Sequence, residues 1–372
     1  MEGFKHIIDV LAKPTILVTF TFIIFFFLFP PNDWFNKWHR KLKFDGLWGK
    51  KSLLIITLIL VAFFVFGLTD SDFRSIVLKP DNVPISGLIF LVFFFTWLSM
   101  HQAYNNDELK DKGLPVDEHY DAPNNKVLVW PDLVYVELIS LILLSTFMLI
   151  WSIGLAAPIE EPANPSESPN PAKAPWYFLG LQEMLVYFDP WMAGVVLPSL
   201  IIVGLMAIPY IDNNPEGSGY YSYKDRKLSI SIFMFGWLIL WVLLIVIGTF
   251  LRGPNWNFFG PFEFWDPHKV VPLNNVNLSD YFWVIFLKQP LPSNILLRES
   301  IGFFVTGFYL MIVPVLLAKT LFKKMYSAYG PIKYTFIMIF GLTMLALPVK
   351  MYLRWIINLK YIVAIPEWFF NI

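Results

Sequence analysis

The sequence predicts an all-α, polytopic integral membrane protein: a helical bundle of about eight transmembrane helices, with an amphipathic helix in the loop after the fourth span. Three observations support this prediction. Hydrophobic residues make up 56% of the 372 residues, charged residues only 15%, and the mean hydropathy is +0.57. A water-soluble fold cannot bury that much apolar surface. The apolar residues also gather in runs of membrane-spanning length, with prolines clustered between them.

Each expected span is an apolar run of roughly 17–25 residues, the length that crosses the hydrocarbon core. We expect each run to be helical, because an open strand would leave its backbone amides and carbonyls unpaired in lipid. The first run is interpreted as a retained span, because residues 1–13 lack the small-residue cleavage pattern of a secretory signal. The expected spans are 13–30, 52–68, 84–101, 132–155, 193–210, 229–251, 300–319 and 334–352.

The distribution of lysine and arginine predicts the orientation. If the first span enters from the outer side, the inner segments carry most of the basic residues that lie between the spans. Cytoplasmic loops carry such an excess, so both termini are expected on the outer, periplasmic side of a bacterial cytoplasmic membrane. The loop 156–192 and the segment 252–299 then also lie outside. The inner segments are 31–51, 102–131, 211–228 and 320–333.

The composition excludes several kinds of site. The formal net charge is zero, which leaves no electrostatic case for nucleic-acid binding. Cysteine is absent, so disulfides, thiolate metal sites and covalent c-type haem attachment are excluded for this chain. Haem b needs facing pairs of histidines, and only His101 touches an expected span. We therefore expect neither a b haem nor a metal site here. The histidines are His6, His39, His101, His119 and His268.

The most informative segment lies between the fourth and fifth expected spans. An acidic, proline-rich stretch from Glu160 to Pro175 runs directly into the aromatic segment Trp176–Glu183. A loop of this kind can fold back on a bundle at the membrane surface and form a pocket. Landmarks on both sides of it occur in a fixed order: residues 130–135 (Trp-Pro-Asp-Leu-Val-Tyr), 154–158 (Gly-Leu-Ala-Ala-Pro), 161–165 (Glu-Pro-Ala-Asn-Pro), 174–178 (Ala-Pro-Trp-Tyr-Phe) and 207–211 (Ala-Ile-Pro-Tyr-Ile).

With these landmarks, residues 129–252 resemble the C-terminal half of cytochrome b, in the form found as subunit IV of cytochrome bf complexes. Residues 174–178 correspond to the Pro-Glu-Trp-Tyr motif of that family. The resemblance extends weakly to 300–319 and does not cover 1–125.

The resemblance implies a subunit of a quinol–cytochrome c reductase-like (cytochrome bc) complex. The loop would form part of the outer quinol-oxidation pocket, with menaquinol or ubiquinol as the quinol and protons released outside. The resemblance also implies three partners: a cytochrome b subunit that bears the b haems, a Rieske iron–sulfur protein and a c-type cytochrome.

One departure from the family concerns the proton acceptor. Pro175 stands where the family has glutamate, and proline can neither accept a proton nor donate a backbone hydrogen bond. Quinol oxidation needs a nearby base, because the quinol loses protons as its electrons leave. Glu183 is the expected substitute. We expect it to be half-buried among aromatic side chains, with a pKa raised towards neutrality. The alternative is a surface glutamate.

The quinol-binding residues are expected to be Pro175, Trp176, Tyr177 and Gly180. On a helix from Trp176, three-residue spacing would place Tyr177, Gly180 and Glu183 or its neighbour Gln182 roughly on one face. Tyr177 would donate a hydrogen bond in the pocket or lie in the interfacial aromatic belt. Trp176 is interpreted mainly as a packing residue that shapes the loop.

Asp132 is the candidate for proton uptake on the inner side. It lies with Glu137 in the first turns of the fourth expected span. An ionisable residue at membrane depth is often functional, and the resemblance places an aspartate at this helix start near the inner quinone site. The alternative is a carboxylate stabilised by the helix dipole.

Four parts of the chain are expected. Residues 1–125 form a three-span extension, interpreted as an assembly element that packs on other subunits; residues 126–254 form the subunit IV-like domain. Residues 255–299 form an outer cap loop that either docks a cytochrome c or Rieske domain or packs on the bundle. Residues 300–372 add two spans and a tail, in which Pro366-Glu367-Trp368-Phe369 is interpreted as an interfacial anchor rather than a second family motif.

Two other functions stay open. The chain could be a structural scaffold subunit of a respiratory complex without a working quinol site. A transporter is less favoured, because the spans contain few charges and no repeat-related pair of broken helices is evident.

Overall fold

The computed structural model describes residues 2–116, 128–155, 162, 164–213 and 221–372. In this part of the chain seven helices are long and apolar enough to cross a membrane, and a bent helix pair makes an eighth candidate. The predicted all-α bundle of about eight spans is thus confirmed. The seven are Lys50–Gly67, Val83–Asp111, Val129–Gly154, Met192–Ile211, Tyr223–Leu251, Ser300–Lys319 and Lys323–Ile357.

The first candidate span is broken. Helices α1 (Glu2–Leu11) and α2 (Pro14–Leu28) meet at an angle of 74°. Pro14 opens α2, and its ring disfavours a helical conformation for the residue before it. The apolar run expected at 13–30 is therefore α2, and α1 lies across its end.

The next elements alternate between short surface helices and spans. Asn32 caps α3 (Asp33–Lys41) by accepting hydrogen bonds from two amides of its first turn. Asp70 caps α5 in the same way. The remaining elements of this part are η1 (Phe44–Trp48), α4 (Lys50–Gly67), α5 (Ser71–Val77) and α6 (Val83–Asp111).

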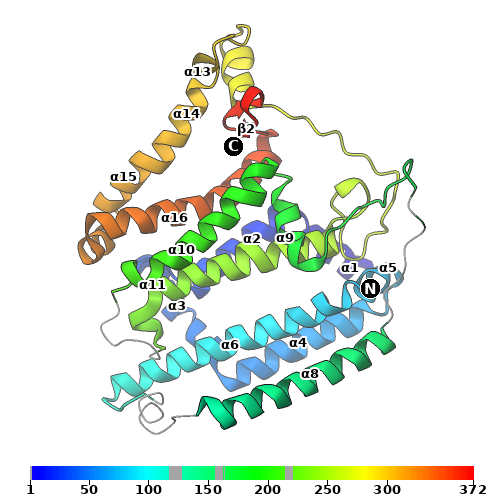
Figure 1. The fold of residues 1–372 in the computed structure, drawn as a ribbon, viewed down its shortest axis with the longest axis vertical. Helices are drawn as coiled ribbons and strands as arrows, with labels where there is room; N and C mark the ends of the chain where they lie inside the picture. The colour runs from blue at the N-terminus through cyan, green and yellow to red at the C-terminus, as the bar shows by residue number, and fades with distance from the viewer. Residues whose placement is uncertain (1, 117–127, 156–161, 163, 214–220) are drawn as a thin grey trace.

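The fourth span is the most exposed. It consists of η2 (Val129–Leu133) and α8 (Val134–Gly154), and no residue of either is buried. In Figure 1 this span lies at the edge of the bundle.

The sixth span is the central one. It runs from Tyr223 to Leu251 through α11 (Tyr223–Met234), η4 (Phe235–Val242), α12 (Leu243–Val246) and η5 (Ile247–Leu251), with a kink in α11 at Arg226. Of the seven spans it has the largest buried share, 44% of its apolar window. It is preceded by α9 (Trp176–Met184), η3 (Met192–Val196) and α10 (Leu197–Ile211).

The C-terminal part adds a helical hairpin and a short tail. The hairpin joins the span Ser300–Lys319 to α16 (Lys323–Ile357), and Gly330, with a φ of 71°, interrupts α16. In the tail, β1 pairs antiparallel with β2, with Ala364 opposite Asn371. The elements are η6 (Pro254–Trp256), η7 (Asp280–Phe286), α13 (Ile295–Arg298), α14 (Ser300–Gly307), η8 (Phe308–Ile312), α15 (Val313–Lys319), β1 (Ala364–Ile365), η9 (Pro366–Trp368) and β2 (Phe370–Asn371).

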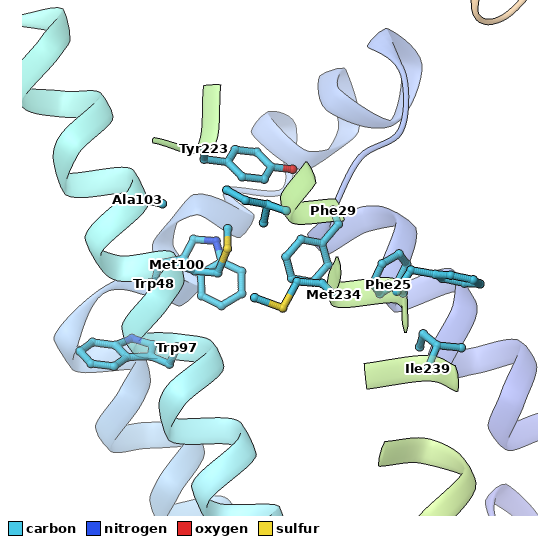
Figure 2. Close-up of a cluster of buried hydrophobic side chains, with 11 residues drawn as sticks. Phe25, Phe29, Trp48, Trp97, Met100, Ala103, Tyr223, Met234 and Ile239 are labelled. Carbon is cyan, nitrogen blue, oxygen red and sulfur yellow. The ribbon is translucent and has the colours of Figure 1, made fainter. Parts of the chain in front are cut away.

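The N-terminal helices share a hydrophobic core with the central span. Figure 2 shows this cluster: Phe25 of α2, the following C-cap residue Phe29 and Met100 of α6 meet Tyr223 and Met234 of α11. The region 1–116 therefore packs at least in part on its own chain. That it also packs on other subunits stays a prediction. Large aromatic and apolar side chains fill the space between the helices, which accounts for the close contact.

The two ends of the bundle differ. In Figure 1 the N-terminus, α5 and α9 lie towards one end, whereas α3 and the C-terminal end of α6 lie towards the other. This alternation agrees with the order of inner and outer segments predicted from the charges. Which end faces the outside stays a prediction.

Candidate functional site

Helix α9 lies against the C-terminal half of the central span because small residues allow a close approach. Gly180 of α9 lies in van der Waals range of Trp241, and Leu179 packs directly over Gly248, where a Cβ atom would come within 2.8 Å of the leucine. Pro175 precedes the first residue of α9, a position that suits its restricted φ and missing N–H. Burial of Leu179 and Gly180 thus docks α9 on the span.

A buried ion pair holds α9 against the end of the central span. Arg252, directly after the central span, donates from Nε to Glu183 Oε2 at 3.0 Å and from Nη2 to Glu183 Oε1 at 2.6 Å. The side chains of Glu183 and Arg252 are 0% and 6% exposed. A bidentate guanidinium–carboxylate pair combines strong hydrogen bonds with a defined geometry.

Two more donors complete the surroundings of Glu183. Tyr187 donates its hydroxyl to Oε1 at 3.0 Å, and Trp256 donates its indole N–H to Oε2 at 3.2 Å. Arg252 also donates to the Trp256 carbonyl at 2.6 Å and lies 3.6 Å from the ring centre of Phe258. We call Glu183, Arg252, Tyr187 and Trp256 the ion-pair cluster.

The environment predicted for Glu183 is therefore wrong. We expected a half-buried carboxylate among aromatic side chains, and the structure shows a fully buried one with four donated hydrogen bonds. Burial opposes the charge of Arg252, but the Glu183 carboxylate outweighs that effect and raises the pKa of the guanidinium above its ordinary value. The reason for the error is Arg252, which lies 69 residues away in the sequence.

The loop before α9 is held at two points. Asn170 donates to the side chain of Asn255 at 3.0 Å and accepts from its backbone N–H at 2.6 Å. Gln182 of α9 accepts from the Ala174 amide at 2.7 Å and donates to the Ala172 carbonyl at 2.8 Å. These bonds define the path of the backbone on both sides of Lys173.

Lys173 is held between these two points. Its Nζ donates to the Thr249 carbonyl at 2.8 Å and lies 4.7 Å from the ring centre of Trp265. Burial, and secondarily the cationic Lys79, lower the pKa of Lys173 to about 7. Among the residues that the structure describes, Thr249 Oγ1 and Trp265 Nε1 are buried without a hydrogen-bond partner. We call Lys173, Thr249 and Trp265 the Lys173 cluster.

The predicted quinol-binding residues are only partly brought together. Trp176 packs edge-on against Tyr177, with ring centres 5.7 Å apart, and lies 6.5 Å from Trp241. The expected common face does not form, because Tyr177 is 48% exposed while Gly180 and Glu183 point into the bundle. Each helical residue turns the chain by about 100°, so the sixth residue on lies well away from the first.

The candidate for inner-side proton uptake lies elsewhere. Asp132 is exposed in η2, and Glu137 is exposed in the first turn of α8. In Figure 1 this helix start lies at the end of the bundle opposite to α1 and α5. Its role in proton uptake stays a prediction.

The structure also places a buried histidine, His39, and the C-terminal residue Glu367. His39 is 2% exposed and lies 2.7 Å from Asp45 and 2.6 Å from the Phe27 carbonyl, so it is an interior residue that the sequence did not single out. In the described part of the chain, no group of three or more histidine or carboxylate side chains could hold a metal ion. Glu367 forms a bidentate pair with Arg298 at 2.9 Å, which ties the tail to α13.

The predicted cap loop has two parts. Residues 252–269 pack beside α9 and α1, where Asp9 accepts from the Phe262 amide at 2.9 Å. Residues 280–298 lie near the C-terminal tail instead (Figure 1). Several residues of the motif set lie outside the described residues, among them Glu160, Glu161, Ala163 and the stretch 156–158, as does His119.

The sequence missed two functional candidates, Arg252 and Lys173. A signal existed for the first, since Arg252 is the charge that ends a long apolar run. For Lys173 the signal was weaker: it is the only basic residue of the proline-rich stretch 160–175.

Residues 162–261 match the family described as cytochrome b(C-terminal)/b6/petD. No solved structure matches the chain. The matched range contains the anchored loop, α9, the central span and the whole ion-pair cluster, and it begins downstream of the landmarks at 130–135 and 154–158. This multi-pass helical membrane protein thus contains, at residues 162–261, a segment that matches the cytochrome b C-terminal family.

Proposed function

We propose that this chain is a membrane subunit of a quinol–cytochrome c reductase-like (cytochrome bc) complex, in which it forms part of the outer quinol-oxidation site. The observation that supports this most is the position of the matched segment. Residues 162–261 include the loop 164–175, α9 and the Arg252 end of the central span, which are bonded to one another. A rigid loop at the end of a bundle is suited to forming one wall of a pocket.

In this proposal, Pro175 and Tyr177 lie on the exposed side of the wall, and Trp176 packs behind them against Trp241. Tyr177 presents an exposed phenol at the start of α9, where a quinol oxygen could accept its hydrogen bond. Gly180 contributes by allowing α9 to lie close to Trp241. The redox centres belong to partner subunits: b haems on a cytochrome b subunit and the cluster of a Rieske protein, with a c-type cytochrome as the final acceptor.

The proposal is tested by purifying the native complex and recording its subunits and its reduced-minus-oxidised absorption spectrum. We expect b haem bands, a Rieske protein, and reduction of the b haem by decylubiquinol or menadiol. A chain that purifies without haem-bearing partners would contradict the proposal and favour a transporter.

The alternative is a scaffold subunit without a working quinol site. Two observations favour it: Pro175 replaces the family's glutamate, and Glu183 is already engaged by four hydrogen bonds. A complex that contains this chain and b haem, yet oxidises no quinol, would support the scaffold role.

The proposed orientation places both termini and the loop 164–175 on the periplasmic side of the bacterial inner membrane. Because the chain has no cysteine, single-cysteine labelling can test this without background. Ser166→Cys should react with a membrane-impermeant maleimide in spheroplasts, whereas Lys43→Cys should react only after permeabilisation. The reverse pattern would invert the topology.

A further inference from the structure

Lys173 lies close to the ion-pair cluster but takes no part in its hydrogen bonds. It is half-buried, its Nζ donates to a backbone carbonyl, and the adjoining carboxylate of Glu183 is bound bidentately by Arg252. Among the described residues, Lys173 has no salt bridge to a carboxylate, unlike Arg252. A buried ammonium without such a partner is costly, so the neutral amine becomes accessible near pH 7.

A purely structural role accounts for part of this arrangement. Thr249 is in the last turn of the central span, and a cation at a helix C-terminus pairs favourably with the final carbonyls. That role explains the bond from Nζ to the Thr249 carbonyl. It leaves unexplained why the two residues that Lys173 Nζ contacts also carry buried polar atoms, Thr249 Oγ1 and Trp265 Nε1, without partners in the described structure.

Unpartnered buried polar atoms are rare, and a cluster of them suggests a bound ligand or water. Thr249 is 1% exposed, so its hydroxyl is not satisfied by bulk solvent. The cluster offers one hydroxyl, one indole N–H and one amine within the family-matched loop region. Hydroxyl and carbonyl oxygens on a ring, as in a quinol or quinone, can use each of these groups.

We propose that the Lys173 cluster binds the polar edge of the quinol, and that neutral Lys173 is the base that takes a proton from one quinol hydroxyl. This assignment rests on the proposed function. Lys173 thereby replaces the glutamate that Pro175, two residues later, has displaced from the family motif.

The proton transfer balances as follows. The amine lone pair forms an N–H bond as the quinol O–H bond breaks, which leaves an ammonium and a quinolate. After the second hydroxyl proton passes to solvent water, both electrons go to the iron–sulfur and haem centres of the partner subunits and the product is the quinone. The ammonium then releases its proton to the outer aqueous phase, which regenerates the amine.

The electrostatic surroundings set the pH range. Lys79 and Arg252 are the cations that face Lys173 and disfavour its charged form, whereas the Glu183 carboxylate favours it. Burial is the largest influence, and together these effects place the pKa of the amine at about 7. The base is therefore present above that pH and is lost below it.

The test uses the native complex with chromosomal variants Lys173→Arg, Lys173→Met and Lys79→Met, and with Lys269→Arg as the matched control. Lys269 also donates to a backbone carbonyl and lies over an aromatic ring in the same cap, 4.0 Å from the centre of Phe259. Reduction of the b haem by decylubiquinol or menadiol is measured between pH 5.5 and 9.5, together with subunit content and melting temperature.

We expect wild-type activity to fall below a pH of about 7. Lys173→Arg keeps a donor for the Thr249 carbonyl but stays charged at every pH tested, so its turnover at pH 8 should fall by about 10²-fold, the usual contribution of a general base. Lys173→Met should show the same loss, and Lys269→Arg none. Lys79→Met removes a cation, so it should raise the pKa of Lys173 and move the acid limb to higher pH.

Wild-type turnover and an unchanged acid limb in Lys173→Arg would overturn the inference and leave Lys173 as a helix cap. An unshifted limb in Lys79→Met would also count against it, and this variant does not alter Lys173 itself. A wild-type complex that oxidises no quinol would instead refute the proposed function, so the two failures are distinguishable.

Discussion

The Lys173 cluster lies before the start of α9 and the ion-pair cluster lies at its C-terminal end, and the two differ in how their buried charges are paired. Glu183 has a bidentate cation and two further donors, so its carboxylate is fully paired. Lys173 has one backbone carbonyl, and two polar atoms beside it have no partner in the described structure. A satisfied cluster holds the fold together, whereas an unsatisfied one is available for chemistry.

The comparison changes where we expect proton transfer. The sequence pointed to Glu183, because it is the first carboxylate after the aromatic motif. In the structure that carboxylate is hydrogen-bonded to Arg252, Tyr187 and Trp256, whereas Lys173 has no carboxylate partner among the described residues. The proton-acceptor role of Glu183 stays a prediction, and the following variants separate it from a structural role.

The largest effect is expected from Arg252→Met. Removing the guanidinium leaves Glu183 as an uncompensated buried charge, which should destabilise the chain by about 3–5 kcal/mol. The measurement is the melting temperature of the complex and the amount of chain retained in membranes. The control is the double variant Arg252→Met with Glu183→Leu, which removes both charges and should recover much of the loss. Equal stability of the single and double variants would refute the pairing.

Glu183→Gln should also destabilise, by a few kcal/mol, because Arg252 then remains buried without its anion. The amide keeps the size of the side chain, so assembled complex can still be assayed. We expect the acid limb of quinol oxidation to stay at the wild-type pH. A lost or shifted limb with an unchanged melting temperature would instead establish Glu183 as the acceptor.

Gln182→Leu is expected to have an intermediate effect. The variant removes the two hydrogen bonds that fix the backbone around Lys173, each contributing about 0.5–1.5 kcal/mol. The KM for quinol should rise, and limited proteolysis within residues 164–175 should become faster. The exposed Gln289 provides the control as Gln289→Leu. Unaltered proteolysis and KM would show that Gln182 does not position the loop.

Tyr177→Phe should have the smallest effect on stability. Its side chain is 48% exposed, so the free energy of unfolding should change by less than about 0.5 kcal/mol, and the melting temperature should hardly move. Any effect should appear in the KM for quinol, because the phenol would donate only to the bound substrate. A clear loss of stability without a change in KM would mean that Tyr177 is a packing residue.

Much of the fold follows from the sequence. Apolar runs of membrane length predicted the helices, since lipid leaves the backbone no other way to satisfy its hydrogen bonds. The predicted run 13–30 became α2, and 229–251 became most of the central span. The bend of 74° before α2 was not predicted, because proline marks a break without defining its angle.

The exposure of each span could not be predicted from hydropathy. The fourth span and the central span have mean hydropathies of 2.3 and 2.8, yet their apolar windows are 0% and 44% buried. Lipid and protein interiors are similarly apolar, so the composition of a helix does not reveal which of the two surrounds it. Only the packing of α2 and α6 against α11 distinguishes the core (Figure 2).

By itself the sequence determined the membrane class, the spans, the family that residues 162–261 match and the loop that carries the candidate site. These are local properties, set by hydropathy and by motifs of a few residues. The tertiary structure decided which partners the charged groups Glu183 and Lys173 have. Glu183 meets Arg252 across 69 positions, and Lys173 meets Thr249 across 76. The pKa of a buried group depends on partners that are distant in the sequence but close in space. In a low-dielectric interior each such charge and hydrogen bond has a large effect on that pKa.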